Sequence, residues 1–319
     1  MADRYHRNIS YMRISITDLC NMRCQYCMPE NGIEKKPHQE LLSFEQIISI
    51  VKASVPLGIE KIRITGGEPL VRNGIINLVE QIKRVEGIKE IAMTTNGSLL
   101  KTMAKPLKEA GLSRFNISID SLDPSRYKEI TRGGNLSDVL EGIETVLSLG
   151  MMPLKLNTVV IGGLNDHEVA DFAKLTIDRN IDVRFIELMP VGQASQWAKE
   201  RFISNDVLLK RLGLMVTEVA EKGSPAKYFR LPGAQGRIGF INPISHHFCH
   251  ECNRLRLTSD GKLKPCLHSN DEIDLKPVLH QPEEQITQMI ARAIKSKPEK
   301  HHLDQENICT TRNMCQIGG

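Results

Sequence analysis

Residues 11–27 read YMRISITDLCNMRCQYC, a short run of β-forming residues that leads directly into three cysteines. Within the run, Ile14 and Ile16 alternate with polar side chains, a pattern typical of a strand with one polar face. The cysteines have the spacing C-x3-C-x2-C, as Cys20, Cys24 and Cys27. Because a tetrahedral metal site needs four ligands, this stretch predicts either a distant fourth ligand or a position left open.

Similar runs recur through the first two-thirds of the chain. The predicted strands lie at 11–17, 61–67, 90–97, 114–120, 154–161 and 182–189. Amphipathic helical patterns fall between them at 43–55, 73–85, 98–110, 135–149 and 166–179, and a last helix is predicted at 283–295. Alternating strands and helices indicate βαβ units and a parallel sheet. We therefore predict an α/β fold, a partial (incomplete) TIM-type (β/α)6 barrel over 1–190 with a C-terminal extension over 191–319.

Polar side chains share one face of several predicted strands. In 114–120, for example, Asn116 and Ser118 lie opposite Ile117 and Ile119. An ordinary small barrel fills its interior with branched apolar side chains, so a polar inner face predicts a wet cavity for a charged ligand. The alternative is an antiparallel sheet with one face in solvent, but helices between the strands favour the cavity.

Composition restricts the class of protein. A net charge of +4 over 319 residues, with 4% aromatic residues, excludes an extended base-stacking or nucleic-acid-binding surface. We find no leader sequence and no apolar run long enough to cross a membrane. We therefore expect a cytoplasmic protein whose eight cysteines are metal ligands or free thiols rather than disulfides. The chain has no GxxxxGK[ST] phosphate-binding loop.

A second group of three cysteines lies near the C-terminus, as Cys249, Cys252 and Cys266. Each group matches a four-iron, four-sulfur (4Fe–4S) cluster with one iron left open, since ferredoxin-type clusters use four cysteines. The alternative is zinc. The first group would then need a distant ligand, and the second could use a nearby histidine, namely His246, His247, His250 or His268. Spacing alone leaves this choice open.

The first group resembles the signature of the radical S-adenosylmethionine enzymes. It has an aromatic residue, Tyr26, before its last cysteine, and the sequence Gly66-Gly67-Glu68-Pro69 follows the second predicted strand, where that superfamily has a GGE motif. The resemblance implies that the open iron binds S-adenosylmethionine. An external one-electron reductant then supplies the electron that cleaves this cofactor to a 5′-deoxyadenosyl radical.

Nearly the whole chain is similar to the GTP 3′,8-cyclase family (the molybdenum cofactor biosynthesis protein A family). The similarity includes FCHECNRLRLT and DGKLKPCL around the second group and the ending MCQIGG. It implies two 4Fe–4S clusters, the second binding GTP, and conversion of GTP to (8S)-3′,8-cyclo-7,8-dihydroguanosine 5′-triphosphate, the first step of molybdenum cofactor biosynthesis. A downstream cyclic pyranopterin monophosphate synthase would take the product. A homodimer is left open.

The same resemblance assigns residues. It implies that S-adenosylmethionine is contacted by Tyr26, Gly67, Ser118 and Met189, and GTP by Arg13, Arg63, Thr94, Lys155, Arg254 and Arg256. The physical argument agrees, because a triphosphate needs several cations at once. No general acid or base is predicted. The resemblance also implies that Gly318 and Gly319 enter the cavity, whereas Cys309 and Cys315 are predicted to be incidental free thiols.

Two rival hypotheses remain at this point. One is another twin-cluster radical enzyme, of the peptide-modifying or sulfatase-maturing type. The Arg-x-Arg sequence after Cys252 and the diglycine end argue against it. The other is a non-enzymatic zinc scaffold, which metal analysis would distinguish.

Overall fold

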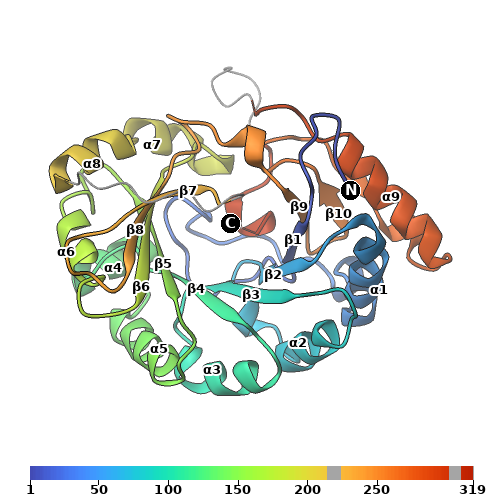
Figure 1. Ribbon diagram of the computed structural model, residues 1–319, viewed down its shortest axis with the longest axis horizontal. Helices are drawn as coiled ribbons and strands as arrows, with labels where there is room; N and C mark the ends of the chain where they lie inside the picture. The colour runs from blue at the N-terminus through green and yellow to red at the C-terminus, as the bar shows by residue number, and fades with distance from the viewer. Residues whose placement is uncertain (214–223, 302–309, 319) are drawn as a thin grey trace.

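The computed structural model describes residues 1–213, 224–301 and 310–318. Six neighbouring parallel strands form the middle of one sheet. They are β1 (Tyr11–Ser15), β2 (Lys61–Thr65), β3 (Glu90–Thr95), β4 (Arg114–Ser118), β5 (Leu154–Val160) and β6 (Ile181–Glu187). Each predicted strand is thus present, and the strands curve around a central space with the helices outside (Figure 1).

The helices follow the predicted alternation. The predicted ones are α1 (Phe44–Ser54), α2 (Ile75–Lys83), α3 (Leu100–Glu109), α5 (Leu136–Ser148), α6 (Val169–Lys174) and α9 (Glu283–Lys295). The sequence analysis missed α4 (Pro124–Thr131), α7 (Ser195–Glu200) and α8 (Asn205–Leu212). For α4 the signal was available, since Asp123 caps its first turn and Pro124 occupies its first position.

The C-terminal region adds strands to both edges of the same sheet. At one edge β8 (Arg237–Ile241) pairs parallel with β6 and antiparallel with β7 (Ala226–Phe229). At the other, β9 (Arg254–Leu257) pairs parallel with β1 and is followed by β10 (Lys262–Lys264) and β11 (Ile273–Asp274). Within the described ranges the outermost strands β7 and β11 do not pair with each other, so the predicted incomplete barrel is confirmed.

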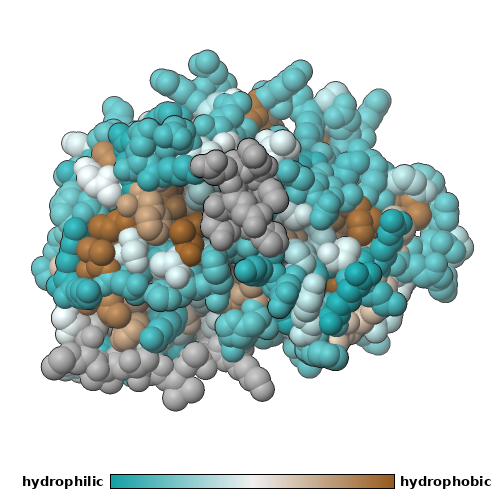
Figure 2. All heavy atoms as spheres, turned by 90° about the horizontal axis from the view of Figure 1, so that it is seen from above, coloured by the Kyte–Doolittle hydropathy of each residue, from teal (hydrophilic) through white to brown (hydrophobic). Residues whose placement is uncertain are grey.

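The two faces of the strands differ as the alternation predicted. Ile14, Ile62 and Ile117 are fully buried in a continuous apolar core against the helices. The alternate side chains, such as Arg13 and Arg63, lie on the inner face. The outer surface seen in Figure 2 is mainly hydrophilic. Among the helices that the structure describes, none has the length and apolar character to cross a membrane.

The last residues of the chain return to the interior of the ring, where Figure 1 marks the C-terminus. They include a short 3-10 helix, η7 (Met314–Gln316), and Met314, Cys315 and Ile317 are all buried. This end of the protein therefore lies inside the ring of strands.

Candidate active site

The first cysteine group lies in the loop after β1, at the carboxyl end of the strand, as predicted. Cys20, Cys24 and Cys27 are each half-buried and none forms a disulfide. The backbone N–H of Met22 donates to Cys20 Sγ at 3.3 Å, and the N–H of Cys27 donates to the carbonyl of Cys24 at 2.9 Å. One loop therefore carries all three thiols, although the described residues contain no group of three or more His, Cys, Asp or Glu side chains already arranged to hold a metal ion.

The glycine pair after β2 is joined to this loop. The N–H of Gly67 donates to the carbonyl of Thr17 at 2.7 Å, and the N–H of Glu68 donates to that of Leu19 at 2.8 Å. A Cβ at position 67 would lie 2.3 Å from the Leu19 oxygen and 2.6 Å from the Asp18 oxygen. Only glycine permits this approach of two backbones, so the GGE turn fixes the segment that enters the first cysteine.

The donor set of this loop fits an iron–sulfur cluster. Burial raises the pKa of Cys24 and raises the pKa of Cys20 to about 11. A hydrogen bond with Cys315, together with burial, raises the pKa of Cys27. The thiols are thus protonated without metal, and binding of iron would displace three protons. Thiolates are the ligands that such clusters use.

The four residues predicted to contact S-adenosylmethionine lie in this loop or at the carboxyl ends of other strands of the barrel. Tyr26 donates its hydroxyl hydrogen to Asp120 Oδ2 at 2.7 Å, and the N–H of Val159 donates to Asp120 Oδ1 at 2.9 Å. Burial raises the pKa of Asp120 to about 6. Ser118 ends β4, and Met189 follows β6 in an apolar cluster that also includes Cys27. The structure therefore brings the predicted residues to one end of the barrel.

Glu68 has a structural role in this region that the sequence analysis did not assign. Its side chain is fully buried. The Leu70 N–H and the Thr95 hydroxyl donate to Oε1 at 3.0 and 2.8 Å, and the Asn96 N–H donates to Oε2 at 2.7 Å. Glu68 therefore connects the ends of β2 and β3 below the cysteine loop.

We expect Glu68 to make stability depend on pH. Burial raises its pKa to about 7, so the folded protein keeps a proton that the unfolded chain loses near pH 4.5, the usual pKa of a glutamate. Its contribution is complete below the unfolded pKa and is lost as pH rises to about 7, a change of about 3 kcal/mol. The Glu68→Gln variant should lack this component. Urea unfolding of both proteins at about pH 5 and about pH 8 measures it, and parallel pH dependence would contradict the prediction.

Six cations converge on the inner face of the barrel. We call this set the cationic face, and it comprises Arg13, Arg63, Lys155, Arg184, Arg254 and Arg256. The strand register aligns Arg13 with Arg63 on one side and with Arg256 on the other. Five of the six were predicted GTP contacts. The sixth, Arg184, is buried and aligns with Asn157 of β5. Lys61 at the start of β2 does not belong to this set, because it is half exposed and its Nζ lies 4.0 Å from Glu90 Oε2.

The cationic face has the properties of an anion site. Burial lowers the pKa of Arg63 to about 10, with Arg114 and Arg184 adding to the decrease. Burial and Arg254 likewise lower the pKa of Arg256 to about 10. Thr94 Oγ1, Arg63 Nε and Arg184 Nε are buried without a hydrogen-bond partner in the described part of the chain. Such clustered charge and unmatched polar atoms favour binding of a polyanion.

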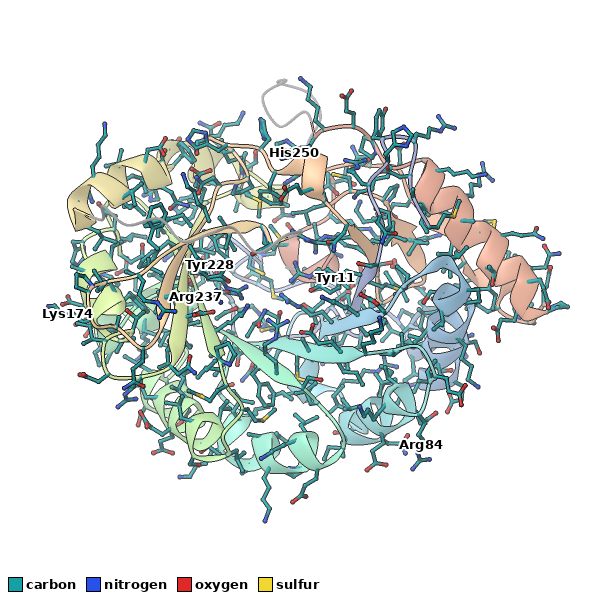
Figure 3. The ribbon with its side chains drawn as sticks, in the orientation of Figure 1. Tyr11, Arg84, Lys174, Tyr228, Arg237 and His250 are labelled. Carbon is teal, nitrogen blue, oxygen red and sulfur yellow. The ribbon has the colours of Figure 1, made fainter. Side chains whose placement is uncertain are left out.

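Two tyrosines border the cationic face and were missed. The Arg63 guanidinium lies 5.3 Å from the centroid of the Tyr11 ring, and Lys155 Nζ lies 5.9 Å from that of Tyr228. Figure 3 shows both tyrosines inside the ring of strands. The signal for Tyr11 was its position two residues before Arg13, which places both on one face of β1.

The second cysteine group lies next to β9, which pairs with β1. Cys249, Cys252 and Cys266 are half-buried. Lys297, almost fully buried, donates to the carbonyls of Arg254 and Pro265 at 2.9 and 2.7 Å. Burial alone would raise the pKa of Cys252, but Lys297 and Arg254 outweigh it and lower this pKa to about 7. The sequence analysis missed Lys297, which resembles any charged residue after a helix.

The histidines near the second group fall into two sets. His246 and His250 are exposed and lie near Asp206 and Glu251, at 2.9 and 4.0 Å. The buried pair is instead His268 and His301, with ring centroids 4.7 Å apart. His247 joins this pair, because its Nδ1 lies 2.9 Å from His301 Nε2 and its ring centroid lies 4.3 Å from that of His301.

The chain end connects the two cysteine groups. Met314 and Ile317 pack with Val191, against Cys27 and Met189 from the first side and Leu267 from the second. The Arg256 guanidinium donates to the carbonyls of Ile317 and Gly318 at 3.1 and 2.7 Å. The predicted entry of the tail is thus observed for Gly318, while Gly319 lies outside the described residues.

Cys315 occupies a different environment from the one expected. It is a free thiol, as predicted, but it is buried and contributes to the raised pKa of Cys27. The spacing of the cysteines gave no signal for this contact, because the two residues are far apart in the chain. Cys309, the other thiol predicted to be incidental, lies outside the described residues.

A parallel partial barrel, a three-cysteine loop after its first strand and a glycine pair after its second define a radical S-adenosylmethionine enzyme. Residues 14–176 match the model of the radical SAM superfamily, and residues 181–303 match the model described as Molybdenum Cofactor Synthesis C. The chain is 62% identical to a GTP 3′,8-cyclase of Alkaliphilus oremlandii and 59% identical to one of Alkaliphilus metalliredigens, each with full coverage of both sequences. The chain therefore belongs to the GTP 3′,8-cyclase family, as the sequence resemblance predicted.

Solved structures support the fold at much lower identity. Streptococcus suis SuiB bound to S-adenosylmethionine is 14% identical, with a TM-score of 0.60 over 87% of this chain and 67% of SuiB. The anSMEcpe structure with bound AdoMet is 16% identical, with a TM-score of 0.51 over 89% of this chain and 80% of its own. Both similarities concern the fold.

Proposed function

We propose that this chain converts GTP into (8S)-3′,8-cyclo-7,8-dihydroguanosine 5′-triphosphate in the first step of molybdenum cofactor biosynthesis. The observation that carries the proposal is the cationic face, which lies in one barrel with the two cysteine groups near its ends. A triphosphate is an anion of matching charge. Full-length relatives bear the name of this reaction.

GTP binding is assigned to the inner face. Arg13, Arg63 and Lys155 hold the triphosphate, since buried guanidinium and ammonium groups offer several charged donors to phosphate oxygens. Thr94 adds a hydroxyl that has no partner among the described residues. Arg254 and Arg256 hold the nucleotide at the side of β9. These residues bind and orient the substrate and exchange no proton with it.

The first cysteine group holds an iron–sulfur cluster through Cys20, Cys24 and Cys27. When bound, this cluster supplies the electron that cleaves S-adenosylmethionine. Gly67, Tyr26, Ser118 and Met189 orient that cofactor. The Tyr26–Asp120 hydrogen bond keeps the ring in place, and the apolar cluster around Met189 excludes water.

The second group holds a second 4Fe–4S cluster through Cys249, Cys252 and Cys266. The base of GTP binds at this group, and the exposed positions of His246 and His250 support a site that they do not close. We further propose the division at residue 190, an external one-electron reductant, and transfer of the product to cyclic pyranopterin monophosphate synthase. A homodimer is compatible with this scheme.

Anaerobic reconstitution with iron and sulfide tests the proposal. We expect about eight irons per chain. With S-adenosylmethionine and a strong one-electron reductant, we expect 5′-deoxyadenosine to form together with loss of GTP. ATP in place of GTP is the matched control and should not be consumed. Unchanged GTP would contradict the substrate, about four irons would contradict the second cluster, and bound zinc would support a scaffold instead.

A further inference from the structure

The chain end is held inside the barrel by contacts that the reaction itself does not explain. We call residues 310–318 the tail. Its carbonyls at Ile317 and Gly318 accept hydrogen bonds from Arg256, a residue of the cationic face. A Cβ at Gly318 would lie 2.6 Å from Thr65 Cγ2, so the backbone here fits closely against β2. This close contact with β2 requires other interactions that hold the tail in place.

Arg312 makes the strongest set of contacts at the entrance of the tail. Its Nε and one terminal nitrogen donate to the two oxygens of Glu272, both at 2.7 Å. The other terminal nitrogen donates to Asp260 Oδ2 at 3.1 Å and Oδ1 at 3.2 Å. The side chain is 16% exposed. A bidentate pair plus a second carboxylate uses almost the whole guanidinium, which gives both strength and direction.

The two carboxylates are themselves fixed by the body of the enzyme. Lys264, with a fully buried side chain, lies 3.1 Å from Glu272 Oε1. Lys36 lies 2.7 Å from Asp260 Oδ2 and 3.0 Å from Asp18 Oδ2. Asp18 immediately precedes the first cysteine loop, and Lys264 precedes Cys266 by two residues. Arg312 therefore joins the tail to the supports of both cysteine groups.

We propose that Arg312 is the positioning residue that holds the tail in the barrel and, through the Ile317 and Gly318 carbonyls, sets the orientation of Arg256. The inference rests on the proposed function and deepens it. Arg312 lies outside the cationic face, and its guanidinium is bound by Glu272 and Asp260. It acts on the reaction only through the tail, while Asn313, whose Oδ1 accepts from the Gln193 N–H at 3.2 Å, gives a second and weaker attachment.

The first test is hydrogen–deuterium exchange of the reconstituted holoenzyme without substrates. Arg312→Ala should raise exchange in the tail by about tenfold or more, because loss of buried charged contacts favours local opening. Arg312→Lys, which keeps one charge, should lie between Arg312→Ala and the wild type. The control is Arg179→Ala, since Arg179 pairs with Glu144 on the outer surface and should leave tail exchange unchanged. Unchanged exchange in Arg312→Ala would overturn the proposal.

The second test separates positioning from general stability. In Arg312→Ala we expect normal iron content, a KM for GTP raised by about tenfold, and more 5′-deoxyadenosine per GTP consumed. Arg312→Lys should restore part of the KM. The proposal would be overturned if turnover fell while the KM for GTP and the amount of 5′-deoxyadenosine formed per GTP consumed both stayed at the wild-type values. Hydrogen–deuterium exchange of the tail is measured without substrate. It therefore tests the role of Arg312 even if GTP proves to be the wrong nucleotide.

Discussion

Cys24→Ala should abolish reductive cleavage of S-adenosylmethionine, with a loss of about three orders of magnitude or more in 5′-deoxyadenosine formation. Cys24 is one of three thiols in the loop after β1, and two thiols do not retain a cluster that needs three. Chromatographic measurement of 5′-deoxyadenosine from reduced, reconstituted protein gives this rate. The variant should contain about four irons per chain, all at the second group.

Cys252→Ala is the matched comparison. It removes a thiol just before β9, at the opposite end of the parallel strands from the Gly67 turn. We expect GTP conversion to be lost, while uncoupled cleavage of S-adenosylmethionine continues at a reduced rate, since the first loop is intact. Equal cleavage defects in the two variants would contradict the proposed division of roles between the cysteine groups.

Gly67→Ala should have an effect almost as large as loss of a cysteine. The new Cβ would lie 2.3 Å from the Leu19 oxygen and 2.7 Å from the Leu19 carbonyl carbon. Neither atom belongs to a flexible side chain, so the loop that enters Cys20 must move. We expect loss of the first cluster, about four irons per chain, and no 5′-deoxyadenosine, with the barrel still folded by circular dichroism.

The control for Gly67→Ala is Gly150→Ala. Gly150 has φ +67° with open space around its Cβ position, so alanine there costs about 1 kcal/mol of conformational strain and leaves the cysteine loop in place. Iron content and 5′-deoxyadenosine yield should be those of the wild type. A Gly67→Ala protein with normal iron and cleavage would show that the loop adapts.

The strands of the barrel could be predicted because their apolar residues recur at every second position. This pattern is typical of a strand that buries one face in an apolar core. The same alternation correctly predicted that Arg13, Arg63 and Lys155 share the inner face. The same rule placed Arg254 and Arg256 on one face of a strand, which β9 confirms, but it did not show that β8 and β9 pair with β6 and β1, which are distant in sequence. Runs as short as RLRL carry no sign of which edge they join, so the pairing of β9 with β1 could not be predicted.

Contacts between residues that are distant in sequence could not be predicted either. Lys297 beside Cys252, Cys315 beside Cys27 and Arg312 between Glu272 and Asp260 all join residues from separate segments. No sequence motif indicates any of these three contacts, because the residues that form each contact lie in separate segments. The two cysteine groups, by contrast, could be recognised from the sequence because the cysteines of each group are close together in the chain. The residue roles that the family resemblance implies now have a common location, and the variants above test them.

The cationic face also constrains how the enzyme tells one nucleotide from another. Six positive groups on β1, β2, β5, β6 and β9 respond to phosphate charge, which ATP and GTP share. Binding of the phosphates to the cationic face therefore contributes equally to the affinity for ATP and for GTP. Specificity requires a difference between these two affinities. In the function proposed above, the choice of purine is made away from the phosphates, beside Cys249, Cys252 and Cys266, where the base is proposed to bind. Mutations of the arginines should weaken all triphosphates alike and leave the preference between them intact.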